Sequence, residues 1–206
     1  MNIFFDIDGT LWDSQDRLYS LFCDLVPKNT LSKVEYWSLK RAKITNEDIL
    51  RKYFSYSEDD VKIFTANWMS LIETPEYLRK DILFPFTINT LKDLNQCGYN
   101  IYYVTLRQFA DRVLAEISEK GIDIYCKKCL VSEAKTSKET LVKNSGISLS
   151  ESDIFVGDTG IDIMTGKVLG IRTVAVLSGF RNKQILTEYS PNIIINDISG
   201  LKSLLK

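Results

Sequence analysis

The chain has 206 residues, 45% of them hydrophobic and 26% charged, with a formal net charge of −1. This composition is typical of a soluble globular protein with one core, or with one domain and a smaller insertion. The near-neutral charge gives no general attraction to nucleic acid or to an anionic membrane, and no apolar stretch approaches the length of a membrane span, so we expect neither as a partner.

The first expected element is an apolar strand that starts at residue 2 or 3 and runs into Asp6 and Asp8. We therefore expect no signal peptide and a cytoplasmic location. Gly9 ends the strand, because a flexible turn there re-aims Asp8 and exposes backbone N–H groups that can hold an anion. Two crowded carboxylates usually need a cation, and oxygen ligands suit magnesium. Calcium loops and ordinary turns also contain Asp-x-Asp-Gly, so this segment alone leaves those alternatives open.

Residues 14–83 lose strand character and contain three helix starts, at Ser32, Thr45 and Ser57. Each of these hydroxyl residues is followed three positions later by Glu or Asp, which is the pattern of a capping box. A segment of this length can bury apolar side chains among its own helices. We therefore expect a helical insertion that packs on itself.

The insertion also carries a basic cluster made of Lys40, Arg41 and Lys43. Charge runs on helices usually form a solvated face, and we expect one here. The alternative is that the cluster contacts the anionic tail of a substrate.

After residue 83 the chain returns to alternating helices and strands. We expect helices at 87–97, 108–120, 137–145, 161–169 and 199–206, and strands at 100–105, 122–131, 153–157, 171–176 and 193–195. This alternation predicts an α/β fold with a Rossmann-like, three-layer α/β/α core and a mostly parallel sheet. Residues 1–13 and 84–206 would form the core domain.

Polar residues follow several of these strands at the point where each strand ends. Thr105 ends one apolar run and Asp158 follows another, with Asp162 four residues later. Open α/β sheets bind ligands at the carboxyl edge of their strands. Lys138, at the start of a polar helix, lies between these motifs in the sequence.

This ordered set of motifs resembles the haloacid dehalogenase superfamily, over residues 3 to about 177. The four motifs match Asp6-x-Asp8-Gly9-Thr10, Thr105, Lys138 and Gly157-Asp158-x-x-x-Asp162. The resemblance implies that the insertion at 14–83 is a small helical cap domain, as in phosphoglycolate phosphatase-like members. The segment between Thr105 and Lys138 is too short for the larger α/β cap of other members.

The resemblance also implies a magnesium-dependent phosphatase that hydrolyses a small soluble phosphomonoester. Asp6 would accept the phosphoryl group as an aspartyl-phosphate, and Asp8 would act as general acid and base. Magnesium would be held by the carboxylates of Asp6 and Asp158 and by the backbone carbonyl of Asp8, with Asp162 orienting these ligands from behind. Asp8 favours phosphate over halide, because halide leaves without a proton.

Thr105 and Lys138 would stabilise the equatorial oxygens of the transferred phosphoryl group. Lys135 is an alternative to Lys138 as the motif lysine. Thr136-x-x-Glu139 has the pattern of a capping box and would put Lys138 in the first helical turn. The chain lacks the Lys-Pro dipeptide that is common at this motif, so both lysines remain candidates.

The expected substrate-binding residues are Gly9, Thr10 and Arg107. Gly9 and Thr10 complete the first motif, and Arg107 points from the loop two residues after Thr105.

Two of the four cysteines, Cys126 and Cys129, have the spacing of a redox pair or of two zinc ligands. Zinc would need two further ligands, and the chain has no histidine and no second paired-cysteine motif. We expect reduced thiols in or beside a sheet. The absence of histidine also excludes Ser-His and Cys-His triads, so acid–base chemistry falls to carboxylates or lysine.

Two alternatives to a phosphatase remain. A phosphomutase would use the same residues and return the phosphoryl group to the substrate. A non-catalytic regulatory or binding protein could keep the same fold, but it would be expected to lose some of the motif residues, and none is lost. We expect a monomer or a dimer.

Overall fold

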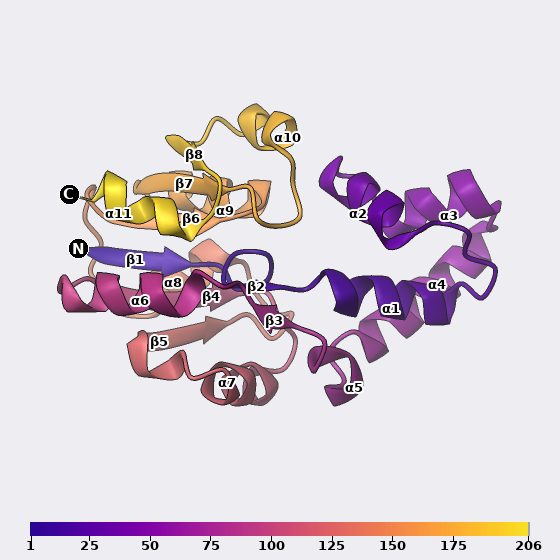
Figure 1. Cartoon of the computed structure of the whole chain (residues 1–206), viewed down its shortest axis with the longest axis horizontal. Helices are drawn as coiled ribbons and strands as arrows, with labels where there is room; N and C mark the ends of the chain where they lie inside the picture. The colour runs from indigo at the N-terminus through magenta and orange to yellow at the C-terminus, as the bar shows by residue number, and fades with distance from the viewer. Residues whose placement is uncertain (206) are drawn as a thin grey trace.

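The computed structural model of the chain describes residues 1–205 and contains one six-stranded parallel sheet (Figure 1). Its strands are β1 (Asn2–Phe5), β4 (Asn100–Thr105), β5 (Cys126–Val131), β6 (Ile154–Gly157), β7 (Arg172–Val176) and β8 (Ile193–Ile195). They lie in the order β5-β4-β1-β6-β7-β8, and every pair is parallel. The predicted α/β fold class is therefore confirmed.

Strand β1 occupies the middle of the sheet, between β4 and β6. Phe4 pairs with Tyr102 on one side and with Phe155 on the other, and the three rings stack with centroids 5.1 and 6.2 Å apart. Such strands read as continuous apolar runs because both faces of a parallel sheet are covered. The pairing brings the carboxyl ends of β1, β4 and β6 to one edge, where the polar motif residues follow.

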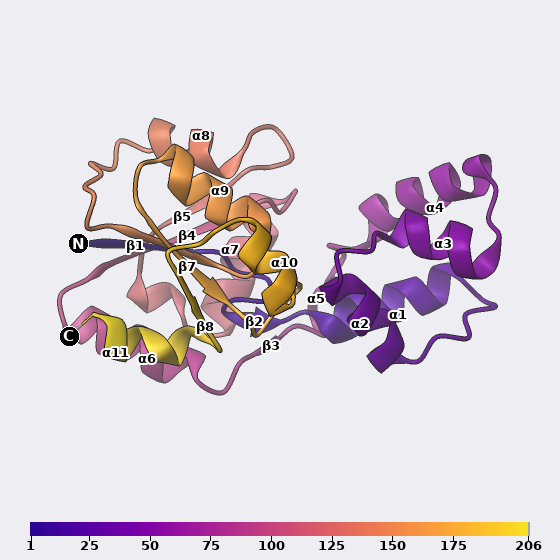
Figure 2. The same ribbon diagram turned by 90° about the horizontal axis from the view of Figure 1, so that it is seen from above.

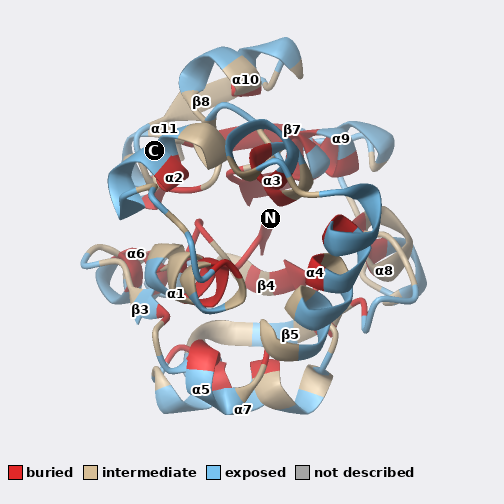
Figure 3. Ribbon diagram, turned by 90° about the vertical axis from the view of Figure 1, so that its right-hand side faces the viewer, coloured by how far each residue is buried: buried red, intermediate tan, exposed pale blue. Residues whose placement is uncertain are grey.

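Helices cover both faces of the sheet and give the three predicted layers (Figure 2). They are α6 (Thr87–Gln96), α7 (Ala110–Glu119), α8 (Lys138–Asn144), α9 (Gly160–Val168), α10 (Lys183–Glu188) and α11 (Leu201–Leu204), with 3-10 turns η1 (Asp123–Tyr125) and η2 (Ile198–Gly200). Helices α6, α7 and α11 contribute to the apolar cluster of Ile3 and Phe5, and α8 packs on the opposite face, with Phe4. Figure 3, which is coloured by burial, shows that strands β4 and β7 are mostly buried between these helices.

A helical unit, α1 to α5, stands beside the carboxyl edge of the sheet (Figure 1). Its helices are α1 (Gln15–Leu25), α2 (Lys33–Arg41), α3 (Asn46–Phe54), α4 (Glu58–Leu71) and α5 (Pro75–Leu78). Helices α1 to α4 enclose an apolar cluster of their own that includes Phe22, Tyr36, Leu50 and Phe64. The short antiparallel strands β2 (Trp12–Asp13) and β3 (Ile82–Leu83) mark where the chain leaves and re-enters the core. The assignment of residues 14–83 as a cap domain stays a prediction.

Local sequence signals located the starts of several helices in this unit. Ser32, Thr45 and Ser57 are the N-caps of α2, α3 and α4, and each forms a full capping box. The capping box expected at Thr136 is wrong, because Ser137 is the N-cap of α8 and makes no side-chain capping bond. Helix α10 was not predicted. None of the helices within residues 1–205 is long and apolar enough to cross a membrane.

Candidate active site

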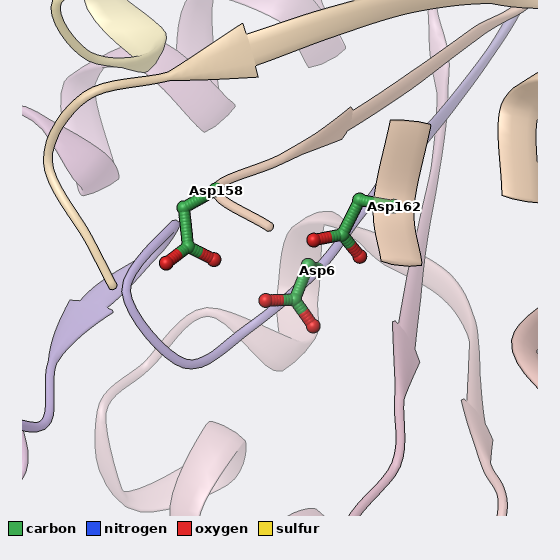
Figure 4. A group of neighbouring side chains, drawn as sticks. All are labelled: Asp6, Asp158 and Asp162. Carbon is green, nitrogen blue, oxygen red and sulfur yellow. The ribbon is translucent and has the colours of Figure 1, made fainter. Parts of the chain in front are cut away.

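Three buried carboxylates meet at the carboxyl edge of the sheet. Asp6 follows β1, Asp158 follows β6, and Asp162 lies in the first turn of α9. One oxygen from each lies within 4.8 Å of the others, and the three side chains converge in Figure 4. Parallel strands explain this convergence, because they deliver the residues that follow them to the same edge.

Lys138 is the cation of this cluster. Its buried ammonium donates to Asp6 Oδ1 and, at 2.6 Å, to Asp162 Oδ1. Lys135 is instead exposed and pairs with Glu133 at 3.3 Å. The structure therefore brings Lys138, and not Lys135, to Asp6. The other oxygen of Asp162 accepts from the Thr159 N–H and hydroxyl, which fixes the carboxylate behind the site.

The electrostatics of the cluster fit a bound divalent cation. Burial, opposed by the Lys138 ammonium, raises the pKa of Asp6 to about 7, and the charge of Asp162 raises it too. Burial and the charges of Asp6 and Asp162 also raise the pKa of Asp158 well above its usual range. Three carboxylates beside one ammonium leave negative charge uncompensated, and an oxygen-only donor set suits magnesium.

Asp158 is held in place by residues from two loops. Thr10 Oγ1 donates to Asp158 Oδ1 at 3.4 Å, and the Phe180 N–H donates to Asp158 Oδ2. Gly9 has φ +81°, and a Cβ there would lie 2.5 Å from Asp158 Oδ2, so this position requires glycine. Gly9 and Thr10 do not line the cavity described below, and their assignment as substrate-binding residues stays a prediction.

Asp8 lies between two arginines. Arg107 donates to both oxygens of Asp8, through Nε at 2.7 Å and Nη2 at 2.6 Å, and Arg17 Nη2 donates to Oδ1 at 2.6 Å. Trp12 Nε1 and the Ser14 hydroxyl donate to the same Oδ1. Although burial raises the pKa of Asp8, the Arg107 and Arg17 guanidinium groups hold it well below its usual range. In this arrangement Asp8 is a carboxylate.

The two arginines extend into a buried ionic network. Arg107 Nη2 donates to Asp81 at 2.9 Å and Nη1 donates to Glu116 at 3.2 Å, while Arg17 Nε lies 3.2 Å from Asp81. Burial raises the pKa of Asp81 to about 6 and that of Glu116 to about 7. Asp8 lies close to β2, where the chain leaves the core, and Asp81 directly precedes β3, where the chain returns. The network therefore contacts both connections between the core and the helical unit.

A cavity of about 280 Å³ opens over these groups. From the core, the lining includes the candidate residues Asp6, Asp8, Thr105, Arg107 and Lys138, together with Phe180. From the helical unit, it includes Arg17, Leu18, Trp68, Ile72 and Glu73, most of which are apolar. Thr105 is 2% exposed, and its hydroxyl accepts from the Arg107 N–H at 3.3 Å. The cavity therefore joins a polar floor to an apolar wall.

Arg17 and Glu73 were missed at the sequence level. Arg17 stands next to Leu18 on the buried face of α1, and a charged residue on an apolar helical face is the signal that could have found it. Glu73 carries no such local signal. Its carboxylate accepts from the Gln108 N–H at 2.9 Å, across a gap of 35 residues in the sequence.

Proteins of known class share both the sequence pattern and the fold. The haloacid dehalogenase-like hydrolase family matches residues 3–176. Phosphoglycolate phosphatase 1 of Pseudomonas aeruginosa is 22% identical, over 97% of this chain and 77% of its own length. Pyrophosphatase PpaX of Bacillus pumilus is 21% identical, over 98% of this chain and 95% of its own.

Among solved structures, a haloacid dehalogenase-like family protein of Streptococcus pneumoniae superposes with a TM-score of 0.80. The alignment covers 100% of this chain and 98% of that one at 20% sequence identity. The structural likeness shows the fold, and the family match covers the motif residues Asp6, Asp8, Thr105, Lys138 and Asp158. This chain belongs to the haloacid dehalogenase-like hydrolases.

Proposed function

We propose that the chain is a magnesium-dependent phosphatase that hydrolyses a small phosphomonoester through an aspartyl-phosphate at Asp6. The observation that carries the proposal is the position of Asp6, whose carboxylate lies in a cavity with Lys138 on one side and a second aspartate, Asp8, two residues away. Relatives named as phosphatases support the same reaction class.

Asp6 is the proposed nucleophile. A phosphate dianion approaching this carboxylate meets repulsion from three aspartates, and the Lys138 ammonium offsets only part of it. Magnesium held by Asp6, Asp158 and the Asp8 carbonyl would supply the remaining positive charge and orient the phosphoryl group. Lys138 and the Thr105 hydroxyl then donate to the phosphoryl oxygens as charge shifts onto them. Asp162 holds Lys138 and so positions the donor.

Asp8 is the proposed proton-transfer group. Held by Arg17 and Arg107 as a carboxylate, it is ready to take a proton from the water that attacks the phosphoenzyme. Protonating the ester oxygen in the first step needs the acid form, so Asp8 must leave at least one arginine and take up a proton from solvent before that step.

The experiment that tests this function is a panel of phosphate esters, with pyrophosphate as the one anhydride, followed by ³¹P NMR with and without magnesium. The panel contains phosphoglycolate, sugar phosphates, nucleoside monophosphates, pyrophosphate and an aryl phosphate. We expect magnesium-dependent appearance of inorganic phosphate and its loss in excess chelator. An isomerised ester in place of free phosphate would assign a phosphomutase, and an unchanged spectrum for every compound would favour the non-catalytic alternative.

The size of the cavity supports a small-molecule partner. The expectations of a cytoplasmic location and of a monomer or dimer rest on the sequence and remain predictions.

A further inference from the structure

A second cavity, of about 370 Å³, adjoins the active site between the helical unit and the core. It lies where the C-terminal end of α2 approaches the loop between β7 and α10 (Figure 1). The two cavities share the Trp68 side chain, and the consecutive residues Phe180 and Arg181 line one cavity each. The second cavity therefore lies next to the active-site cavity, with the Trp68 side chain in the wall of both.

Three cations line the second cavity. Lys40 and Lys43 come from α2 and the turn after it, and Arg181 comes from the β7–α10 loop. Glu47 also lines it, and its carboxylate accepts from the Thr65 hydroxyl at 3.3 Å. Within residues 1–205, none of the three cations has a carboxylate at salt-bridge distance, so the cavity carries excess positive charge.

Lys40 and Arg181 repel each other without an anion between them. Burial and the charge of Arg181 lower the pKa of Lys40 to about 8, although the charges of Glu47 and Asp48 oppose the shift. Lys40 Nζ donates to Asn46 Oδ1 at 3.1 Å, and this neutral oxygen does not compensate the charge. Lys40 and Arg181 are both half-buried, and like charges that are partly removed from water repel each other unless an opposite charge joins them, so the arrangement favours a bound anion.

Arg181 also has N–H groups that are available to bind an anion. Its Nη1 donates to the Lys40 and Phe180 carbonyls at 2.8 and 2.9 Å, which fixes the guanidinium. Its Nε and Nη2 make no hydrogen bond to any described part of the chain. A guanidinium held by one nitrogen presents the other two in the fork that matches a carboxylate or phosphate.

We propose that Lys40 and Arg181 form a subsite for a second anionic group, a carboxylate or a phosphate, carried by the leaving group of the substrate. This inference rests on the proposed function, because it takes the phosphate ester to be bound at Asp6. The proposal follows the alternative stated for the basic cluster, contact with an anionic substrate tail, and not the expected solvated face. Lys40 is half-buried, whereas Lys43 is exposed. Asp6 lines one cavity and the subsite lines the other, so we expect a leaving group longer than a two-carbon acid.

The test is calorimetric binding of non-hydrolysable phosphonates, with magnesium present. Phosphonocarboxylates of increasing chain length, starting at phosphonoacetate, are compared with alkylphosphonates of equal length. The variants are Lys40→Met and Arg181→Gln. The matched control is Lys33→Met, which lies on the same helix outside the cavity and pairs with Asp16 at the surface.

In the wild-type protein we expect the carboxylate to increase affinity about tenfold at a chain length beyond 3-phosphonopropionate, the phosphonate that matches the ester of a two-carbon acid. This increment corresponds to one charge-assisted hydrogen bond. The increment should vanish in both variants and persist in the control. Its absence at every chain length, its appearance only with phosphonoacetate or 3-phosphonopropionate, or its retention in either variant would overturn the subsite. Binding that follows the expectation in a protein that releases no phosphate from any ester would instead overturn the proposed function.

Discussion

Asp8, Asp81 and Glu116 share two arginines at the base of the helical unit. Arg107 is 5% exposed and contacts all three carboxylates, so it is the centre of the network. Lys120 adds a third cation, with its Nζ 3.9 Å from Glu116 Oε1, so three cations face the three carboxylates. The pKa values of Asp81 and Glu116 are nevertheless raised, because burial disfavours the charged form of each acid.

Replacing Arg107 should destabilise the protein strongly. Arg107→Met removes the charge and leaves buried carboxylates without their main partner, and breaking such a network costs about 3–5 kcal/mol. The measurement is the free energy of unfolding in urea, with Arg79→Met as the exposed control. A loss no larger than that of the control would mean that the network contributes nothing to stability.

Glu116 should make stability fall as the pH rises. The folded state keeps the Glu116 proton up to about pH 7, whereas the unfolded chain releases it near the ordinary glutamate value. Folded protein therefore binds more protons between these values, and stability is lost as the pH rises through this window. The free energy of unfolding of Glu116→Gln, measured in urea from pH 5 to pH 7.5, should increase relative to that of wild type as the pH rises. A difference that stays constant over this range would contradict the assignment.

At the scale of elements, Glu73 ties the segment after α4 to the core. Its buried carboxylate accepts from the N–H groups of Gln108 and Phe109, which lie at the N-terminus of α7. Helix N-termini leave such donors unpaired, and a carboxylate there also meets the positive end of the helix dipole. Arg112, one turn into α7, donates to the Glu73 carbonyl and closes the contact.

Removing this contact should cost about 1–2 kcal/mol, as for the loss of a helix cap. The comparison is Glu73→Ala against Glu76→Ala, which truncates an exposed glutamate three residues away. Urea unfolding gives the free energies, and hydrogen exchange at Gln108 and Phe109 locates the effect. If both variants unfold alike and exchange at α7 is unchanged, the carboxylate does not cap this helix.

Elements with local signals could be predicted from the sequence. Strands 100–105 and 193–195 were predicted at their observed bounds, and capping boxes located α2, α3 and α4. Helix α10 has six residues and only Leu186 buried, so no periodicity marks it. In the site, the motif residues were predicted, whereas Arg17 and Glu73 were not, because their partners are set by how the helical unit meets the core.

For the whole molecule, the position of the helical unit over the carboxyl edge restricts access to Asp6. Leu18, Trp68 and Ile72 line the cavity of about 280 Å³ from that side. A cover of this kind excludes water and contacts the leaving group. We therefore expect it to keep large phosphorylated surfaces away from Asp6.

Small esters should therefore be hydrolysed far better than phosphoproteins. The check is kcat/KM for small phosphomonoesters against a folded phosphoprotein and a short phosphopeptide from the same sequence. We expect the values to fall by orders of magnitude from the small esters to the folded protein. Equal rates for all three would show that the helical unit does not restrict the site.

The most direct test of the account is whether Asp6 carries the phosphoryl group during turnover. An aryl leaving group departs without a proton, so Asp8→Asn should still form the phosphoenzyme but hydrolyse it slowly for lack of a base. Acid quenching with an aryl phosphate and magnesium, followed by mass spectrometry, should find a phosphoryl group on the Asp6 peptide of this variant. Asp6→Asn should show neither the modification nor phosphate release, and the surface control Asp93→Asn should behave as wild type. Phosphate release by Asp6→Asn, or a phosphoryl group on another residue, would contradict the mechanism.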